Sequence, residues 1–368
     1  FDLVFVLALT QCTALMADEP TWEGLAKGLL VLGVLWWSWV GWSWLTSAVD
    51  PDEGAVRIVV FGAMAALLVV SLCVPEAFDD LALLFAGAYA AVRVAHICVF
   101  AIASRDDAQM RSSVTALGCS TAIGVGLLVA ASFADGWLQG ALWALALTLD
   151  VGGPLLFGVA GWRIAPAHFA ERYGLILIIA LGESIVAIGI GAHGHVDAGI
   201  VVAAVLGVIV AAMIWWAYFD VVALVAERHL SEAQPGREQN SMARDSYSYL
   251  HFPMIAGIVL IALGLKKTLE HVEDPLKIEI AVALLGGVAL YLLAHVAFRW
   301  RNVHTLSTRR LLLAGVFVAL IPAAVELPAL ATVAIVAALL VGLIAYEAIR
   351  YAEARDQVRH RLAHGAEP

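Results

Sequence analysis

Glu183 is a carboxylate in an apolar stretch that is long enough to cross a bilayer. If Arg172 marks the membrane edge, eleven helical residues place Glu183 about 16 Å deep, near the middle of a hydrocarbon slab about 30 Å thick. An ionisable group there costs at least ~2.5–3.5 kcal/mol, so it faces a bundle interior, a cavity or a partner. Two interpretations stay open. Either Glu183, with the adjacent Ser184, binds a substrate or ion, or it joins helices as a protonated, hydrogen-bonded group.

Two further charged residues reach a similar depth from other apolar segments. Arg93 lies about twelve residues, or ~18 Å, from the outer end of its segment, and Asp150 lies about thirteen residues from the outer end of its own. A buried arginine needs a carboxylate, and Asp150 and Glu183 are both available. The sequence does not choose between them, nor between a structural ion pair and a substrate or proton site.

The residues after Asp150 predict an irregular helix. Gly152 and Gly153 lower the helix propensity, and Pro154 removes a backbone donor and strains the preceding turn. We therefore expect this span to be kinked or broken beside an acid, which is the local chemistry of many transporter sites. A kink without a function is the alternative.

The composition is that of an integral membrane protein. Of 368 residues, 62% are hydrophobic and only 14% are charged, against about 25% charged in globular chains. The net charge of −10 argues against nucleic-acid binding. The four cysteines show no CxxC spacing, so we predict no disulfide framework, metal site or cofactor. Because the chain begins with Phe1 rather than Met, we expect an upstream cytoplasmic segment.

Apolar windows of about 20 residues predict twelve membrane-spanning helices. The last two windows are separated only by Pro322, Glu326 and Pro328, so a count of eleven stays open. The expected spans are 1–17, 25–47, 56–75, 81–103, 113–133, 137–158, 172–192, 199–226, 249–268, 278–298, 309–325 and 329–350.

The distribution of Lys and Arg predicts the orientation in the membrane. Sixteen of the 21 basic residues lie in alternate loops and the C-terminal tail, and four lie on the opposite side. The positive-inside rule therefore places both termini in the cytoplasm, which predicts a multi-pass protein of the cell inner membrane. Membrane lipids are the expected surroundings, and the sequence leaves a homo-oligomer open.

The two halves of the chain resemble each other, with matching segments six spans apart. Because six is an even number, both halves keep the same topology, which predicts two parallel six-helix repeats. The predicted domains are 1–160, 161–351 and a cytoplasmic tail, 352–368. Gln11 takes the position of Glu183, so only the second half carries an acid there. The matches are 5–11 with 177–183, 36–39 with 215–218, and 95–96 with 294–295.

Three segments of the chain resemble the bacterial low temperature requirement A family. They are 1–6 (FDLVFV), 168–175 (HFAERYGL) running into 181–184 (LGES), and 249–254 (YLHFPM). The resemblance implies a polytopic inner-membrane protein named for a cold-growth phenotype, and it supplies no substrate or reaction. The matching motif positions are Asp2, His168, Glu171, Arg172, Gly182, Glu183, Ser184, His251 and Pro253.

Three functional hypotheses follow. The first is a proton- or cation-coupled secondary transporter of a small molecule or ion, with Glu183 as the coupling carboxylate and Arg93, Asp150 and Gln11 near the same midplane site. The second is a membrane-embedded enzyme that acts on lipids, with Glu183 or Asp150 as general acid or base. The third is a non-catalytic membrane or sensor protein. Transport is preferred over an enzyme because neither a metal cluster nor several interfacial acids are evident.

Overall fold

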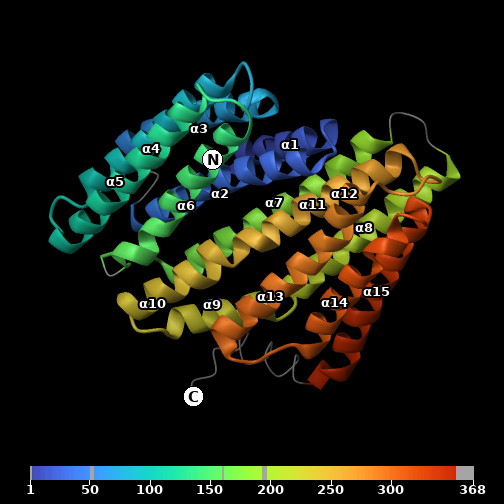
Figure 1. Cartoon of the computed structure of the whole chain (residues 1–368). Helices are drawn as coiled ribbons and strands as arrows, with labels where there is room; N and C mark the ends of the chain where they lie inside the picture. Colours follow the sequence, from blue (N-terminus) through green and yellow to red (C-terminus); the bar gives the residue numbers. More distant parts are fainter. Residues whose placement is uncertain (1, 50–53, 160, 193–196, 354–368) are drawn as a thin grey trace. The chain divides into compact units, whose positions relative to one another are not determined.

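The computed structural model describes residues 2–49, 54–159, 161–192 and 197–353. These residues form helices joined by short loops, and within these ranges no strand is found beyond an isolated bridge between Pro275 and Pro328 (Figure 1). The predicted all-helical fold is therefore confirmed for this part of the chain. The predicted tail, 352–368, lies almost entirely outside the described residues.

The chain divides into two compact units. Unit 1 is Phe1–Ile176 with Glu232–Phe252, and unit 2 is Leu177–Ser231 with Pro253–Pro368. The boundary therefore falls inside two long helices, after Ile176 in α7 (Pro166–Gly191) and after Phe252 in α11 (His251–Glu270). Each unit is described by itself below.

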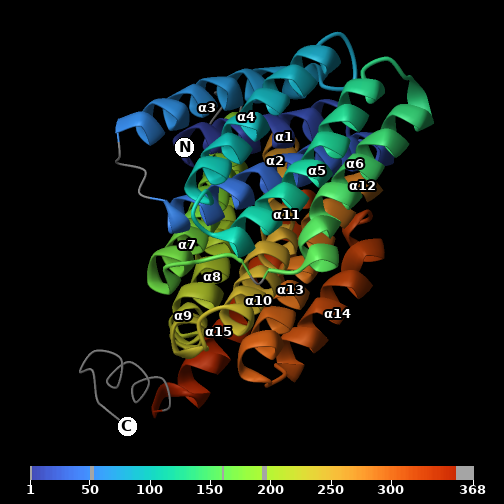
Figure 2. The same ribbon diagram turned by 90° about the vertical axis from the view of Figure 1, so that its left-hand side faces the viewer.

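Unit 1 contains the first six long helices of the chain. Helix α2 packs on α4 and α6, and α3, α4, α5 and α6 lie side by side in that order (Figures 1 and 2). The helices are α1 (Asp2–Asp18), α2 (Trp22–Ala48), α3 (Gly54–Cys73), η1 (Val74–Glu76), α4 (Ala82–Ala103), α5 (Ala108–Ala131), α6 (Gly136–Phe157), the first part of α7, α10 (Arg237–Met242) and the π-helical η2 (Ala243–Tyr249).

Unit 2 is held by closely packed helices. A Cβ atom added to Gly257 of α11 would lie 2.6 Å from the carbonyl oxygen of Gly287, so only a residue without a side chain permits this crossing. Helix α15 packs on α8 and α14. The helices are the second part of α7, α8 (Ala198–Phe219), α9 (Val222–Glu232), most of α11, α12 (Ile278–Ala281), η3 (Val282–Gly286), α13 (Gly287–Val303), α14 (Thr308–Ala324) and α15 (Ala329–Arg350).

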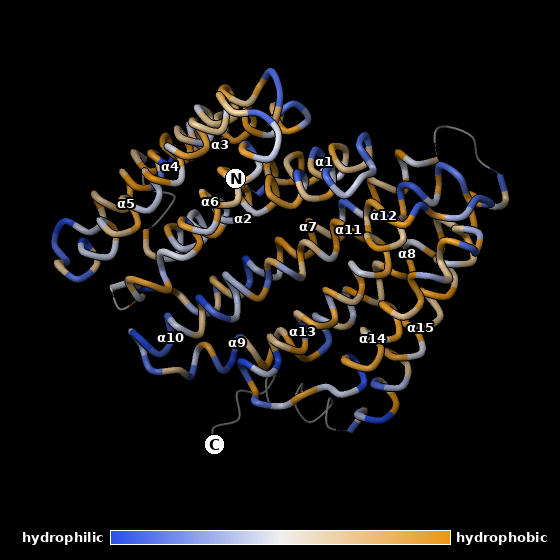
Figure 3. Tube along the Cα trace, in the orientation of Figure 1, coloured by the Kyte–Doolittle hydropathy of each residue, from blue (hydrophilic) through white to orange (hydrophobic). Residues whose placement is uncertain are grey.

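The outer faces of the helices suit a lipid environment. On α3, the exposed residues Ile58, Phe61, Leu68 and Leu72 follow helical spacing and form an apolar stripe. The helices are apolar along most of their length, and polar residues gather towards their ends and in the loops (Figure 3). Such continuous apolar exposure is costly in water and natural in a bilayer. The protein is therefore a multi-pass membrane protein.

Ten segments of the described chain are long and apolar enough to span a membrane. They correspond to ten of the twelve predicted spans. The other two, α1 and α14, have 17 residues each, and at 1.5 Å per residue each is about 25 Å long, the short end of what a bilayer requires. The count of twelve spans, the six-helix repeat and the predicted domain boundaries therefore stay predictions.

Helix α6 is not broken after Asp150. It continues through Gly152, Gly153 and Pro154 as far as Phe157, and Gly158 then leaves the helix with a φ of 77°. Two side chains of η2 support this region, because Tyr249 donates a hydrogen bond to the Val151 carbonyl (2.5 Å) and Arg244 donates one to the Pro154 carbonyl (3.2 Å). Packing against η2 thus stabilises a segment that its sequence alone weakens.

Candidate functional site

The buried charges of unit 1 meet in an ion pair. Nη2 of Arg93 on α4 lies 3.0 Å from Oδ1 of Asp150 on α6, and Thr121 of α5 bonds to both side chains, at 2.5 Å and 3.1 Å. Nη1 of Arg93 donates to the carbonyl of Trp37 on α2 (3.4 Å). The expected carboxylate partner of Arg93 is thereby confirmed, and it is Asp150. This arrangement ties four helices of unit 1 together.

The other candidate residues near the midplane are divided between the units. Glu183 and Ser184 are both buried, at 1% exposure each, in the part of α7 that belongs to unit 2. Gln11 is half-buried on α1 of unit 1. These three residues and the pair Arg93–Asp150 thus belong to two separate units, which are described individually. A common binding site for the five stays a prediction.

Two of the motif residues form a second charged cluster in unit 1. Nη2 of Arg172 lies 3.2 Å from Oδ1 of Asp2, which also accepts a hydrogen bond from Nε1 of Trp39 (2.8 Å). The guanidinium of Arg172 also bonds to the hydroxyl of Thr46 and lies over the Trp39 ring, 5.6 Å from its centroid. This cluster ties α1, α2 and α7. The motif residues His168 and Glu171, by contrast, are exposed on α7.

Another motif residue with a buried side chain, His251, joins an aromatic cluster. Its Nδ1 lies 2.9 Å from the carbonyl oxygen of Ser246, and its ring contacts Tyr173 and Tyr247, with centroids 5.2 Å apart in both cases. Residues of the π-helix η2 therefore surround it, and π-helical turns are frequent at functional sites.

Ser248 of η2 is a hydrogen-bonding centre that the sequence did not reveal. Its hydroxyl accepts from Nε1 of Trp44 (2.9 Å) and lies 3.1 Å from the hydroxyl of Tyr173, while its carbonyl accepts from Nε1 of Trp36 (2.9 Å). The cluster of tryptophans in 36–44 was visible in the sequence, but a single serine two hundred residues away gave no signal that it would satisfy them.

A small cavity of about 50 Å³ lies beside the Arg93 ion pair in unit 1. His96 lines it, is completely buried and packs against Gly41, where an added Cβ would come within 2.8 Å of the ring. This volume has room for a few water molecules and for no organic solute. The interior of unit 1 is therefore closely packed around its charges.

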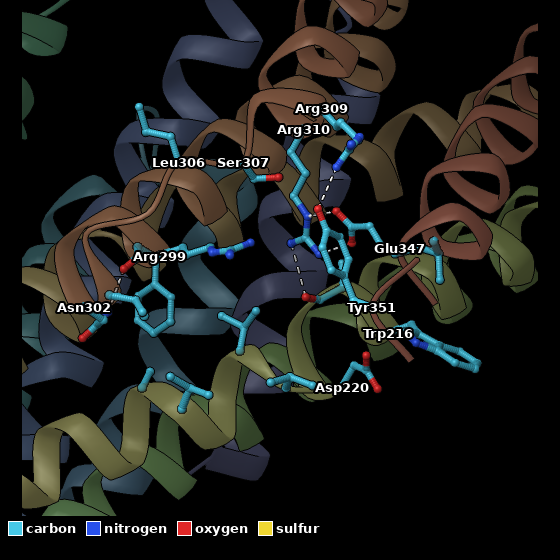
Figure 4. Close-up of a pocket in the computed structure, with 18 of the residues that line it drawn as sticks. Trp216, Asp220, Arg299, Asn302, Leu306, Ser307, Arg309, Arg310, Glu347 and Tyr351 are labelled. Carbon is cyan, nitrogen blue, oxygen red and sulfur yellow. Dashed lines mark hydrogen bonds and ion pairs between the residues drawn. The ribbon is translucent and has the colours of Figure 1, made fainter. Parts of the chain in front are cut away.

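Unit 2 contains a much larger pocket, of about 660 Å³. The ends of five helices surround it: α8 and α9 at their junction, α13 and α15 at their last turns, and α14 at its first turn (Figure 4). One wall is apolar, and the other carries charged and hydroxyl groups. The charged residues that line it are Asp220, Arg299, Arg309, Arg310 and Glu347.

Arg310 forms the inner polar wall of this pocket. Its Nε and Nη2 bond to the two carboxylate oxygens of Glu347, at 3.1 Å and 2.7 Å, so the pair is bidentate. Nη1 contacts the imidazole of His295 at 2.7 Å and the carbonyl of Ala217 at 3.4 Å. Arg310 is 5% exposed, so a buried guanidinium with partners on all three of its nitrogens closes a pocket of solute size.

This cluster is not among the sites predicted from the sequence. Arg310 is one of the basic residues that indicate the orientation, and Glu347 lies in the last predicted span, 329–350. A signal existed, because Glu347 is an acid inside the last apolar run and Arg310 begins the preceding one. Neighbouring antiparallel helices bring such ends together.

The described part of the chain contains no group of three or more His, Cys, Asp or Glu residues placed to hold a metal ion. Its charged clusters instead pair arginine with a single carboxylate, as at Asp150, Asp2 and Glu347. These arrangements suit the binding of ions or polar solutes and the fixing of helices.

Comparisons with known proteins show the family of the chain. The family model for the bacterial low temperature requirement A protein (LtrA) matches residues 1–345. The chain is also 29% identical over 304 residues to an uncharacterized protein of Rhizobium meliloti (strain 1021), an alignment that covers 79% of this chain and 73% of that protein. No solved structure matches the chain significantly.

Proposed function

The chain belongs to the bacterial low temperature requirement A family of membrane proteins, and on that premise we propose that it is a secondary transporter of a small polar solute. The observation that carries the proposal is the pocket of about 660 Å³ in unit 2, closed by the ion pair between the buried Arg310 and the half-buried Glu347. Its volume falls within the range of about 300–1,000 Å³ that is usual for small-molecule sites.

Charged groups inside a membrane support this proposal further. Such residues are rare and mark the pathways of substrates, ions and protons. In unit 2, Arg310 and Glu347 border a space that a solute can enter, and His295 contacts the same guanidinium. A solute that bonds to Arg310 or Glu347 competes with their mutual ion pair, which couples its binding to a rearrangement of α14 and α15.

Glu183 takes the role of the coupling carboxylate in this proposal. It is buried in the same unit as the pocket, on a helix that is long enough to span the bilayer. A carboxyl group at that depth can carry a proton or bind a cation as the transporter changes state. The positive-inside bias supports a pocket that faces the cytoplasm of an inner-membrane protein, because Arg299, Arg309 and Arg310 belong to the basic side.

Proton-linked flux into proteoliposomes tests the proposal. Vesicles that contain purified protein and the pH indicator pyranine would receive organic carboxylates, phosphate esters and amino acids under an imposed pH gradient. We expect at least one class to change the internal pH faster than in protein-free vesicles. An absence of solute-dependent flux with all three classes would reject secondary transport.

Glu183→Gln separates coupling from folding. Gln keeps the size and hydrogen-bonding capacity of a protonated Glu but cannot exchange a proton, so we expect an unchanged melting temperature and loss of proton-linked flux. The exposed Glu326 of unit 2 provides the matched control, since Glu326→Gln makes the same chemical change outside the pocket. Full flux in Glu183→Gln would remove Glu183 from the mechanism.

A further inference from the structure

The three arginines that line the pocket of unit 2 differ in their hydrogen-bond partners. Arg310 is bidentate to Glu347. Arg299 donates from Nε to the hydroxyl of Thr305 (3.0 Å), and Arg309 donates from Nη1 to the hydroxyl of Tyr351 (2.8 Å). A hydroxyl satisfies one donor without neutralising the charge, and a guanidinium has five N–H donors. Arg299 and Arg309 therefore bring positive charge and further donors to the pocket.

The pocket is amphipathic. Arg309 and Arg310 stand on the α14 side with Ser307, and Arg299 extends from α13 into the same space (Figure 4). The start of α9 contributes apolar side chains, among them Val225, and Phe298 of α13 adds to this apolar wall, whereas Asp220 lies at the junction of α8 with α9. One end of a ligand would meet guanidinium groups, and the rest would lie on hydrocarbon.

We propose that this pocket binds an organic phosphate, with the phosphate group on Arg299 and Arg309 and the organic part on the apolar wall. Several guanidinium groups that surround one group match the several acceptor oxygens and the double charge of a phosphate. Three arginines and two acids line the pocket, and one acid, Glu347, is already paired with Arg310. The charges that remain are those of Arg299, Arg309 and Asp220, so the lining keeps one net positive charge, and the phosphate group would lie on the two arginines.

The inference rests on the proposed function, since it names the substrate class of the same pocket. A phosphate group has two sources at this location, because a soluble phosphate ester and the headgroup of an anionic phospholipid share this chemistry. The volume of about 660 Å³ accommodates either a small ester or a headgroup with its glycerol.

Calorimetric titration of the purified full chain with sn-glycerol 3-phosphate tests the proposal, with glycerol as the uncharged control. We expect binding of the ester and none of glycerol. Arg299→Gln and Arg309→Gln should each weaken binding about tenfold or more, because each removes a charge-assisted hydrogen bond. Arg301→Gln is the matched control, because Arg301 lies on the same helix and does not line the pocket.

Melting temperatures in nanodiscs of different lipid composition show whether the phosphate group belongs to a soluble ester or to a lipid headgroup. If the headgroup of a lipid is the ligand, discs that contain phosphatidylglycerol should raise the melting temperature of the parent protein more than that of Arg299→Gln, relative to discs of phosphatidylcholine alone. If a soluble ester is the ligand, lipid composition should affect both proteins equally while glycerol 3-phosphate stabilises only the parent. Equal responses of parent and Arg299→Gln to both probes would overturn the proposal.

The experiments distinguish a failure of the phosphate-binding proposal from a failure of the transport proposal. Glu183→Gln should still bind glycerol 3-phosphate, since it lacks only the coupling group. Binding without flux in the parent protein would retain the phosphate site and reject transport, whereas solute flux without phosphate binding would reject the phosphate site alone. Arg299→Lys keeps the charge and provides a check against misfolding, with an expected affinity between those of the parent and Arg299→Gln.

Discussion

Unit 1 contains the ion pair Arg93–Asp150 and unit 2 contains the ion pair Arg310–Glu347, each between two helices, and the two pairs differ in what surrounds them. In unit 1 the side chains of Arg93 and Asp150 are 1% and 7% exposed, beside a cavity of about 50 Å³. In unit 2 the side chains of Arg310 and Glu347 are 6% and 19% exposed and border a pocket of about 660 Å³. The same chemical pair is thus enclosed by protein in one unit and accessible to a solute in the other.

Because their surroundings differ, the two arginine–carboxylate pairs should have different roles. A pair enclosed by protein has no competing partner, so it fixes the helices that carry it. A pair beside a solute-sized pocket can exchange its partner for a ligand at a modest cost, because water and ligand solvate the charges when they separate. The enclosed pair therefore belongs to the framework of the protein, and the accessible pair belongs to its proposed pathway.

The largest effect should come from breaking the enclosed pair. Arg93→Ala leaves Asp150 buried without its counter-ion and should lower the free energy of unfolding by about 3–5 kcal/mol. Urea or SDS unfolding of the purified protein measures this change. The double variant Arg93→Met with Asp150→Leu should recover much of the loss, since it removes both charges. A single variant as stable as the parent would show that the pair does not hold unit 1 together.

Breaking the accessible pair should affect stability less and function more. Glu347→Gln keeps one acceptor for Arg310, and water in the pocket can solvate the guanidinium, so we expect a loss of about 1–2 kcal/mol. Solute flux should fall at least about tenfold, which is the effect of ~1.4 kcal/mol on a rate. Asp150→Asn is the matched variant in unit 1. If both substitutions destabilise equally and leave flux unchanged, the contrast between the units is wrong.

The carboxylates of Glu347 and Asp150 should also differ in their reactivity towards a water-soluble reagent. A water-soluble carbodiimide with a glycine ester should modify Glu347 and leave Asp150 unmodified in the folded protein, as measured by mass spectrometry of peptides. Modification of both at similar rates would mean that water reaches the interior of unit 1 as readily as the pocket of unit 2.

The sequence predicted the enclosed pair better than the accessible one. Arg93 and Asp150 stand out because each is a lone charge in an apolar run, and the cost of burying an unpaired arginine requires a partner. The choice of Asp150 over Glu183 depended on how the helices pack, which no single sequence specifies. Lone charges can thus be identified from hydropathy alone, whereas their partners depend on tertiary structure.

The pocket of unit 2 could not be predicted in the same way. Arg299 and Arg309 lie near helix ends, where charged residues are ordinary. Glu347 is an acid inside an apolar run, but its position does not reveal which basic residue it pairs with. The pocket forms where the ends of five helices meet in space. The fold class, by contrast, followed directly from composition, because a chain with so few charges cannot form a stable aqueous surface.

A third ion pair extends the comparison to the surface and should have the smallest effect. Oδ2 of Asp107 lies 2.8 Å from Nη2 of Arg163, and the two side chains are 29% and 77% exposed, respectively. Asp107 also caps α5, because its Oδ1 accepts hydrogen bonds from the backbone N–H groups of Gln109 and Met110, both at 3.1 Å. The N–H of Met110 is the main cause of a lowered pKa of the Asp107 carboxyl group, and Arg163 adds to it.

The pH dependence of this pair follows from the direction of the shift. A carboxyl group with a lowered pKa in the folded state stabilises the fold above its ordinary pKa of 3.8, and the contribution is lost as the pH falls through the lowered value. Asp107→Asn retains the capping oxygen, so it should lower the melting temperature only slightly at pH 7, and the difference from the parent should shrink progressively as the pH falls below 3.8. High salt should reduce the difference at pH 7, because exposed charges are screened. A difference that changes neither with falling pH nor with high salt would mean that the amide disturbs the cap itself, and that the charge of the Asp107–Arg163 pair contributes nothing here.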